Sequence, residues 1–265
     1  MIDIHCHILP ALDDGAENWD IAVQMARIAA ADGVTDIIAT PHMVPESKFV
    51  PEPHRVRELT DELNQRLDSQ GIPVTIHPGM EVYLTPETPD LLEAGRLLTL
   101  ADSEYLLVEL PANSVPHYVD QVLFEIMLQG VRPILAHVER NRSLATDHFR
   151  LQELLNRGNL AQLNASSLMG GQGRKAQSVA KDLVRRGLIQ FIASDGHSLG
   201  RRKPVIGDAV EVLGRKLGSE RAYQLSIGNP RSVLANESVT LSDGEAVDRW
   251  NILGRVRRVV QDIFQ

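Results

Sequence analysis

The sequence predicts an α/β fold in which a parallel barrel is built from about seven strand–helix units, within a single domain of residues 1–265. Short apolar runs alternate with longer amphipathic stretches, and this alternation is typical of a parallel sheet covered by helices. The chain length is one that a single barrel often has. Neither a GxGxxG nor a Walker pattern follows the first run, which disfavours an open nucleotide-binding sheet.

Seven short runs are predicted as strands because they are rich in Ile, Val and Leu and too short for helices. They cover residues 2–7, 34–39, 74–77, 105–109, 132–136, 160–164 and 189–193. Amphipathic stretches between them predict helices over residues 18–31, 52–70, 115–129, 147–157 and 174–186, each followed closely by a glycine. Residues 204–265 lack strand patterns and predict a mainly helical C-terminal part.

Composition narrows the classes of partner. A net charge of −8 gives no sign of a basic face for a nucleic-acid backbone. No run of about 18 apolar residues occurs, so we expect no membrane insertion. Cys6 is the single cysteine, and no signal-peptide pattern precedes it, which together predict a cytoplasmic protein. Residues 245–264 are amphipathic and can pack on the barrel or on a second copy, which leaves a homo-oligomer open.

Every predicted strand carries a polar group at or beyond its C-terminal end. His5 and His7 alternate on the first strand and therefore project from one face, with Cys6 on the other. In a parallel barrel these strand ends converge on the face where active sites form. The candidate ligands are five histidines and four carboxylates: His5, His7, Asp14, His42, Glu81, Glu109, His137, Asp195 and His197.

This set of ligands predicts a centre of two or three metal ions. Nine nitrogen and oxygen donors exceed the needs of one ion and suit Mn²⁺, Fe²⁺, Co²⁺ or Zn²⁺. Taken singly, the two histidines of the first strand are compatible with a packed core, and Asp14 with a turn before Gly15. The conjunction favours metal, because burying several carboxylates together without a cation is very costly.

The motifs around these residues resemble the PHP superfamily, named for polymerase and histidinol phosphatase. More narrowly, they resemble the manganese-dependent bacterial tyrosine-protein phosphatases of capsule and exopolysaccharide clusters. The matching motifs are HCHILPALDDG (5–15), ATPH (39–42), GMEV (79–82), LVELP (107–111), ILAHVERN (134–141), LNASSLMG (163–170) and SDGHSLGRRKP (194–204), with a weaker match in GNPRSVLANE (228–237). The resemblance implies a distorted (β/α)7 barrel of the TIM-like kind with a trinuclear site.

The resemblance also implies a role for each candidate. One ion takes His5, His7, Glu81 and Asp195; a second shares Glu81 and takes Glu109 and His137; a third takes Asp14, His42 and His197. Arg140 and Arg202 bind the substrate phosphate and act in catalysis with Asp14 and His42. Relatives read Arg-Pro-Pro where this chain reads Arg202-Lys203-Pro204, so Arg201 is a second candidate for the phosphate contact.

The expected activity is hydrolysis of phosphotyrosine on a protein, for which a bacterial tyrosine kinase controlling exopolysaccharide synthesis is the expected partner. Metal-activated hydroxide is the expected nucleophile. Three divalent ions would exceed the charge of the four carboxylates by two, which favours an anionic substrate. Cysteine-dependent catalysis is disfavoured, because an arginine is needed six positions after Cys6 and Leu12 stands there.

Three alternatives stay open at this point. A PHP-type phosphatase acting on a small molecule such as histidinol phosphate would share the site chemistry. A non-catalytic scaffold with a degenerate site is disfavoured, because all nine ligand positions are filled. A metal-dependent amidohydrolase typically has a bridging modified lysine, and no lysine stands near a predicted strand end.

Overall fold

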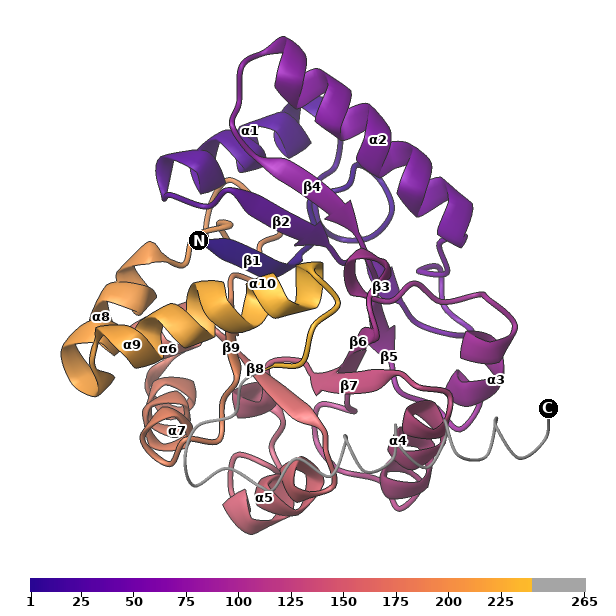
Figure 1. The fold of residues 1–265 in the computed structure, drawn as a ribbon, viewed down its shortest axis with the longest axis vertical. Helices are drawn as coiled ribbons and strands as arrows, with labels where there is room; N and C mark the ends of the chain where they lie inside the picture. The colour runs from indigo at the N-terminus through magenta and orange to yellow at the C-terminus, as the bar shows by residue number, and fades with distance from the viewer. Residues whose placement is uncertain (240–265) are drawn as a thin grey trace.

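The computed structural model describes residues 1–239, which form a curled parallel sheet surrounded by helices (Figure 1). Three strands pair in the order β1 (Ile2–Cys6), β2 (Asp36–Ala39) and β4 (Thr75–Pro78). Six more pair in the order β3 (His42–Met43), β5 (Glu81–Tyr83), β6 (Tyr105–Glu109), β7 (Arg132–Leu135), β8 (Leu160–Asn164) and β9 (Phe191–Ala193). Every pairing between these strands is parallel.

The two groups of strands form one barrel of seven strand positions. β3 follows β2 directly along the chain, and β5 follows β4. In each case a short non-strand segment separates the two strands, so each pair occupies one position in the barrel. The circuit closes where Cys6 bridges to Gly196, with the amide of His7 donating to the carbonyl of Gly196 at 2.8 Å. The predicted α/β barrel is therefore confirmed. The interruptions between β2 and β3 and between β4 and β5 distort it from a regular barrel.

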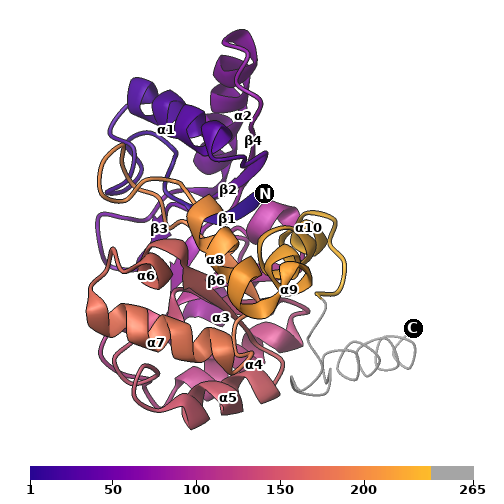
Figure 2. The same ribbon diagram turned by 90° about the vertical axis from the view of Figure 1, so that its left-hand side faces the viewer.

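The five predicted helices are all present. They are α1 (Trp19–Ala31), α2 (Pro53–Ser69), α4 (Val119–Leu128), α5 (His148–Asn156) and α7 (Arg174–Arg185). Asn18 caps α1 by accepting a hydrogen bond from the amide of Ile21 at 3.0 Å. Figures 1 and 2 show α1 and α2 against the strands β1, β2 and β4, with α4, α5 and α7 around the other strands.

Several short elements lie outside the predicted pattern. They are α3 (Thr88–Glu93), α6 (Ala165–Met169) and the 3₁₀ turns η1 (Leu100–Asp102) and η2 (Val138–Arg140). Elements of three to six residues offer too few turns for a helical period to be visible.

The C-terminal part is helical as predicted, as far as the structure describes it. It contains α8 (Gly207–Leu217), α9 (Ser219–Tyr223), the π-helical turn η3 (Gln224–Gly228) and α10 (Asn229–Leu234). The predicted amphipathic stretch 245–264 lies outside the described residues, as does the end of the predicted domain 1–265. Within residues 1–239, no helix is long and apolar enough to cross a membrane.

Two hydrophobic cores hold the barrel, one inside the strands and one between strands and helices. The inner core contains Ile4, Leu107 and Ile134, and Val233 of α10 joins it at the end of the barrel. The outer core contains Cys6 together with the buried faces of α1, α2, α4, α5 and α7. The separation follows the alternation of side chains along the strands, except in β1, where a register shift between Asp3 and Cys6 puts Ile4 and Cys6 in different cores. Cys6 is thus a packing residue on the face opposite His5 and His7, as predicted.

Candidate metal centre

All nine predicted ligand residues gather at the C-terminal ends of the strands. β1 and the loop after it supply His5, His7 and Asp14; β3 supplies His42; β5 supplies Glu81; β6 supplies Glu109; and the segments after β7 and β9 supply His137, Asp195 and His197. Two other histidines lie elsewhere and pair with acids. His77 pairs with Asp36 at 3.0 Å, and His148 pairs with Asp182 at 3.1 Å.

The first group of ligand atoms contains the two histidines at the end of β1. The Nε2 atoms of His5 and His7 lie 3.1 Å apart. Each lies 3.3 Å from Oε2 of Glu81 and 3.6 Å from Oδ1 of Asp195. These four side chains are almost completely buried. They are the set that the family resemblance implies for one ion, and the structure brings them close together.

The second group is centred on Glu81. Nε2 of His137 lies 2.9 Å from Oε1 of Glu81 and 3.6 Å from Oε1 of Glu109. His42 also reaches this group, since its Nδ1 lies 2.9 Å from Oε2 of Glu81. The carboxylate of Glu81 therefore contacts ligands of all three predicted ions and is the geometric centre of the site.

The third group lies nearer the solvent. Oδ1 of Asp14 is 3.4 Å from Nε2 of both His42 and His197, and the side chain of Asp14 is 53% exposed. His7 also belongs to this group, because its ring centroid lies 3.7 Å from that of His197. The ligand atoms thus fall into three overlapping groups, with His7 and His42 each bordering two of them, and their division among three ions stays a prediction.

Three further polar residues orient the ligands, and the sequence argument did not assign them a role. Asp13 accepts a hydrogen bond from Nδ1 of His7 at 2.6 Å. The amide oxygen of Gln162 contacts Nδ1 of His5 at 3.1 Å and accepts a hydrogen bond from the backbone of His137 at 2.8 Å. Carboxylate and amide groups behind metal-binding histidines fix the ring orientation and the tautomer.

Asn164 completes this supporting network. It accepts a hydrogen bond from Gln162 and donates one to Oδ2 of Asp195 at 2.7 Å. The sequence signals were present: Asp13 precedes Asp14 in a double acid, and Gln162 and Asn164 share the inner face of β8. Their partners, however, come from distant parts of the chain.

The backbone is shaped to hold the ligands. Gly15 packs so closely that a Cβ atom there would lie 2.1 Å from the carbonyl oxygen of His7. His137 and Asp195 adopt left-handed conformations, with φ of 30° and 53°. Non-glycine residues rarely adopt such values, which cluster at functional sites where surrounding contacts enforce them.

In the protein alone, protons on histidines balance the buried carboxylates. Burial disfavours the charged form of His5, but Glu81 and Asp195 outweigh it and raise the pKa of His5 to about 9. Burial likewise opposes the charged form of His42, and Asp14 and Glu81 raise its pKa to about 11. Against the effect of burial, His5 and its neighbours hold the pKa of Glu81 well below its usual range. The site therefore attracts positive charge strongly.

The donor set fits divalent metal ions. Among the described residues, the buried atoms without a hydrogen-bond partner include Nδ1 of His42, Oε2 of Glu81 and Nε2 of His197. The first two lie 2.9 Å apart without the geometry of a hydrogen bond. Buried polar atoms that face one another unpaired are costly unless a further group binds them. Imidazole and carboxylate donors are suited to Mn²⁺, Fe²⁺ and Zn²⁺.

The predicted arginines take different positions. Nη1 of Arg140 lies 2.9 Å from Oδ2 of Asp195, and Nη2 of Arg202 lies 2.8 Å from Oδ1 of the same residue. The side chains of Arg140 and Arg202 are 40% and 31% exposed, so both border the metal centre and the solvent. Arg201 instead extends to the carbonyl oxygen of Gly171. The geometry therefore favours Arg202 over Arg201 as the residue beside the site.

Comparison with known proteins places the chain in a family. The sequence pattern described as "Capsular polysaccharide synthesis, CpsB/CapC" matches residues 1–235. The tyrosine-protein phosphatase YwqE of Bacillus subtilis is 38% identical over 254 residues, which cover 96% of this chain and 99% of YwqE. The tyrosine-protein phosphatase CpsB of Streptococcus pneumoniae is 28% identical, over 90% of this chain and 100% of CpsB.

A solved structure agrees with these matches. The crystal structures of YwqE from Bacillus subtilis and CpsB from Streptococcus pneumoniae are described as those of unique metal-dependent tyrosine phosphatases. One of them is similar over 93% of this chain and 99% of its own, with a TM-score of 0.87 and 38% sequence identity. Sequence and structure thus give one answer, and the chain belongs to the CpsB/CapC family of capsular polysaccharide synthesis.

Proposed function

We propose that this chain is a metal-dependent phosphatase that removes phosphate from tyrosine residues of proteins. The observation that carries the proposal is the position of Arg140 and Arg202, which both reach Asp195 at the edge of a nine-residue ligand cluster. The relatives named above as tyrosine-protein phosphatases support it. The proposed substrate is a bacterial tyrosine kinase that controls capsule or exopolysaccharide synthesis, and the proposed location is the cytoplasm.

The metal ions are proposed to be Mn²⁺, held in three overlapping sets. His5, His7, Glu81 and Asp195 form the innermost set; Glu81, Glu109 and His137 form the second; Asp14, His42 and His197 form the outermost. Such ions supply an activated water near neutral pH and neutralise charge on a phosphoryl group. Asp13, Gln162 and Asn164 hold His7, His5 and Asp195 in position by hydrogen bonds.

Arg140 and Arg202 are proposed to bind the phosphate of the substrate. Guanidinium groups match two phosphate oxygens at once, which fixes orientation as well as charge. Both side chains are partly exposed beside Asp195, where an anion arriving from solvent meets them. A phenol also leaves more readily than an alkyl alcohol, because its pKa is about 10. Tyrosine phosphate therefore needs less help from a general acid than serine phosphate does.

The test is hydrolysis after controlled loading with metal. Purified protein is stripped with EDTA and then given Mn²⁺, Fe²⁺, Co²⁺ or Zn²⁺ separately. Phosphate release is measured from a phosphotyrosine peptide, from the same peptide with phosphoserine, and from histidinol phosphate. We expect no activity after EDTA, the largest recovery with Mn²⁺, and kcat/KM highest for phosphotyrosine. A higher kcat/KM for histidinol phosphate would show a small-molecule phosphatase instead.

A further inference from the structure

A cavity lies beside Arg140, next to the metal centre. Its volume is about 300 Å³, and it lies between the loop after His137 and the first turns of α7. It is lined by Glu139, Arg140, Arg142, Ala145, Gln172, Lys175, Ala176 and Val179. None of these residues except Arg140 has a place in the proposed metal and phosphate chemistry, so the cavity calls for its own explanation.

The cavity is lined by three cations, of which Arg140 pairs with Asp195. Within residues 1–239, Arg142 and Lys175 have no carboxylate within 4.0 Å, whereas most exposed arginines of this chain pair with an acid. Glu139 is the one acid of the lining; it is only 3% exposed, and its Oε2 has no hydrogen-bond partner. Even with Glu139 ionised and Arg140 paired with Asp195, Arg142 and Lys175 leave the lining with an excess of positive charge.

The start of α7 adds further donors at this place. α7 is twelve residues long, its N-cap is Gly173, and neither a capping side chain nor an acidic residue satisfies its first turn. The first amide groups of a helix have no partners within the helix, and they favour an anion placed against them. Lys175 belongs to this turn, and its side chain lines the cavity together with Gln172, Ala176 and Val179.

The loop that carries the arginines is held firmly. The side chain of Asn141 donates hydrogen bonds to the carbonyls of Pro111 and Ser114, at 2.8 and 3.0 Å. Its oxygen accepts hydrogen bonds from the amides of Ser143 and Leu144, both at 3.0 Å. The backbone on either side of Asn141 is therefore fixed before any ligand arrives, which lowers the entropic cost of binding.

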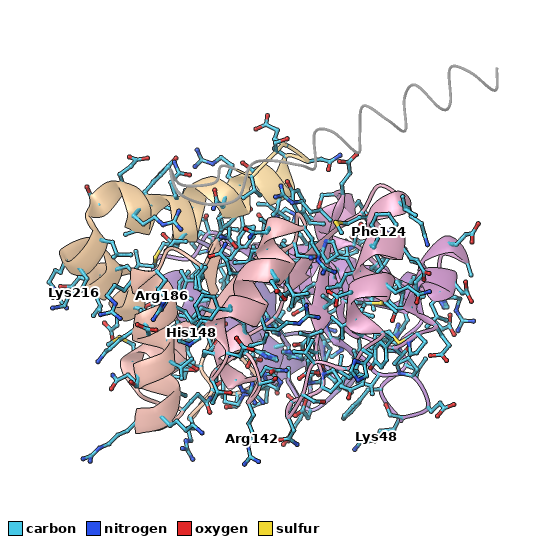
Figure 3. All side chains as sticks on the ribbon, turned by 90° about the horizontal axis from the view of Figure 1, so that it is seen from below. Lys48, Phe124, Arg142, His148, Arg186 and Lys216 are labelled. Carbon is cyan, nitrogen blue, oxygen red and sulfur yellow. The ribbon has the colours of Figure 1, made fainter. Side chains whose placement is uncertain are left out.

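The cavity and the metal centre are neighbours, because Arg142 of the lining extends from the same side of the molecule as the chain beside His42. Figure 3 shows Arg142 and Lys48 extending from one side. Phe49, which follows Lys48, stacks on the metal-centre residue His42 with ring centroids 5.9 Å apart. Arg140 lines the cavity and also contacts Asp195, so it is shared between the two sites.

We propose that this cavity is a specificity subsite that binds the carboxylate of an acidic residue close to the phosphotyrosine in the substrate peptide. The inference rests on the proposed phosphotyrosine activity. Arg140 joins the two sites, so a peptide with its phosphate at the metal centre places neighbouring residues next to the cavity. A carboxylate is a group that an arginine and a lysine side chain bind together. The small side chains of Ala145 and Ala176 leave room for it.

The experiment compares two phosphotyrosine peptides that differ only in their flanking residues, Asp and Glu in one, Asn and Gln in the other. A third substrate, p-nitrophenyl phosphate, has no flanking residues. The variant is Arg142→Gln with Lys175→Gln, which leaves Arg140 and every proposed ligand in place. The control is Lys181→Gln with Lys216→Gln, which removes the same charge from exposed positions of α7 and α8.

We expect the unmodified Mn²⁺-loaded enzyme to favour the acidic peptide in kcat/KM by about two- to fivefold, the range for exposed ion pairs. The Arg142/Lys175 variant loses that preference and keeps its rate on p-nitrophenyl phosphate, whereas the control variant keeps both. Equal rates on the two peptides, or a preference that survives in the variant, would overturn the subsite alone. Hydrolysis of p-nitrophenyl phosphate but of neither peptide would overturn the proposed function, and the subsite with it.

Discussion

The carboxylate of Asp13 lies 2.6 Å from Nδ1 of His7, behind the metal centre rather than in it. The same carboxylate accepts hydrogen bonds from the backbone amides of His42 and Gly15, at 2.9 Å each. Three segments that carry or flank ligands are therefore tied to one buried acid. Its role is to position the ring of His7, and this role can be separated experimentally from ligation.

Asp13→Asn is expected to weaken metal binding without removing a ligand. The asparagine amide keeps one acceptor oxygen. Its NH₂ group, however, replaces the second oxygen and faces N–H groups that donate to the carboxylate in the unmodified protein. Loss of such a supporting group typically lowers metal affinity about 10- to 100-fold. Titration calorimetry of the EDTA-treated protein with Mn²⁺ measures this effect. Asp20→Asn, with the same change on the exposed start of α1, serves as the control. Equal affinities in the two variants would exclude the role.

Arg202→Lys is expected to lower kcat/KM for p-nitrophenyl phosphate by about tenfold to a hundredfold, the value of a hydrogen bond to a charged group. Lysine keeps the charge but loses the forked pair of donors that matches phosphate. Arg201→Lys is the matched control, because Arg201 extends to the carbonyl of Gly171 rather than to Asp195. A larger loss in Arg201→Lys than in Arg202→Lys would reverse the assignment of the two neighbours.

The sequence predicted the ligand cluster because the signal is local. Alternation on β1 puts His5 and His7 on one face, and the C-terminal ends of parallel strands meet whatever the loops do. The supporting residues were not predictable in this way. Gln162 reaches His5 across 157 positions of sequence, and only the closed barrel brings them together. The positions of Arg201 and Arg202 likewise depend on loop geometry, which no periodicity encodes.

Removal of metal is expected to make stability depend on pH in the alkaline range. The folded pKa of His5, about 9, lies above its ordinary value of 6.5, and that of His42, about 11, lies further above it. A group with a raised folded pKa stabilises the fold fully below about pH 6.5 and loses that contribution as pH rises through the folded pKa. The Tm of the EDTA-treated protein should therefore fall from about pH 7 to pH 10.

The Mn²⁺-loaded protein should show a smaller fall over the same range, because ions replace protons as the positive charge beside Glu81 and Asp195. Differential scanning calorimetry at several pH values, with and without Mn²⁺, compares the two. A Tm of the metal-free protein that stays level or rises over this range would contradict the proposed charge balance. The double variant His5→Gln with His42→Gln should lose most of the pH dependence when metal is absent.

Gly15→Ala is expected to damage the site through the backbone. The new Cβ atom would lie 2.1 Å from the carbonyl oxygen of His7 and 2.5 Å from its Cβ, so His7 has to move. Overpacking of this kind costs about 1–3 kcal/mol. Gly200→Ala is the control, because nothing lies within 4 Å of the added atom there. In Gly15→Ala, both the free energy of unfolding in urea and the affinity for Mn²⁺ should fall. In Gly200→Ala, both should stay unchanged. Unchanged Mn²⁺ affinity in Gly15→Ala would contradict this expectation. It would show that metal binding does not depend on the position of His7 beside Glu81.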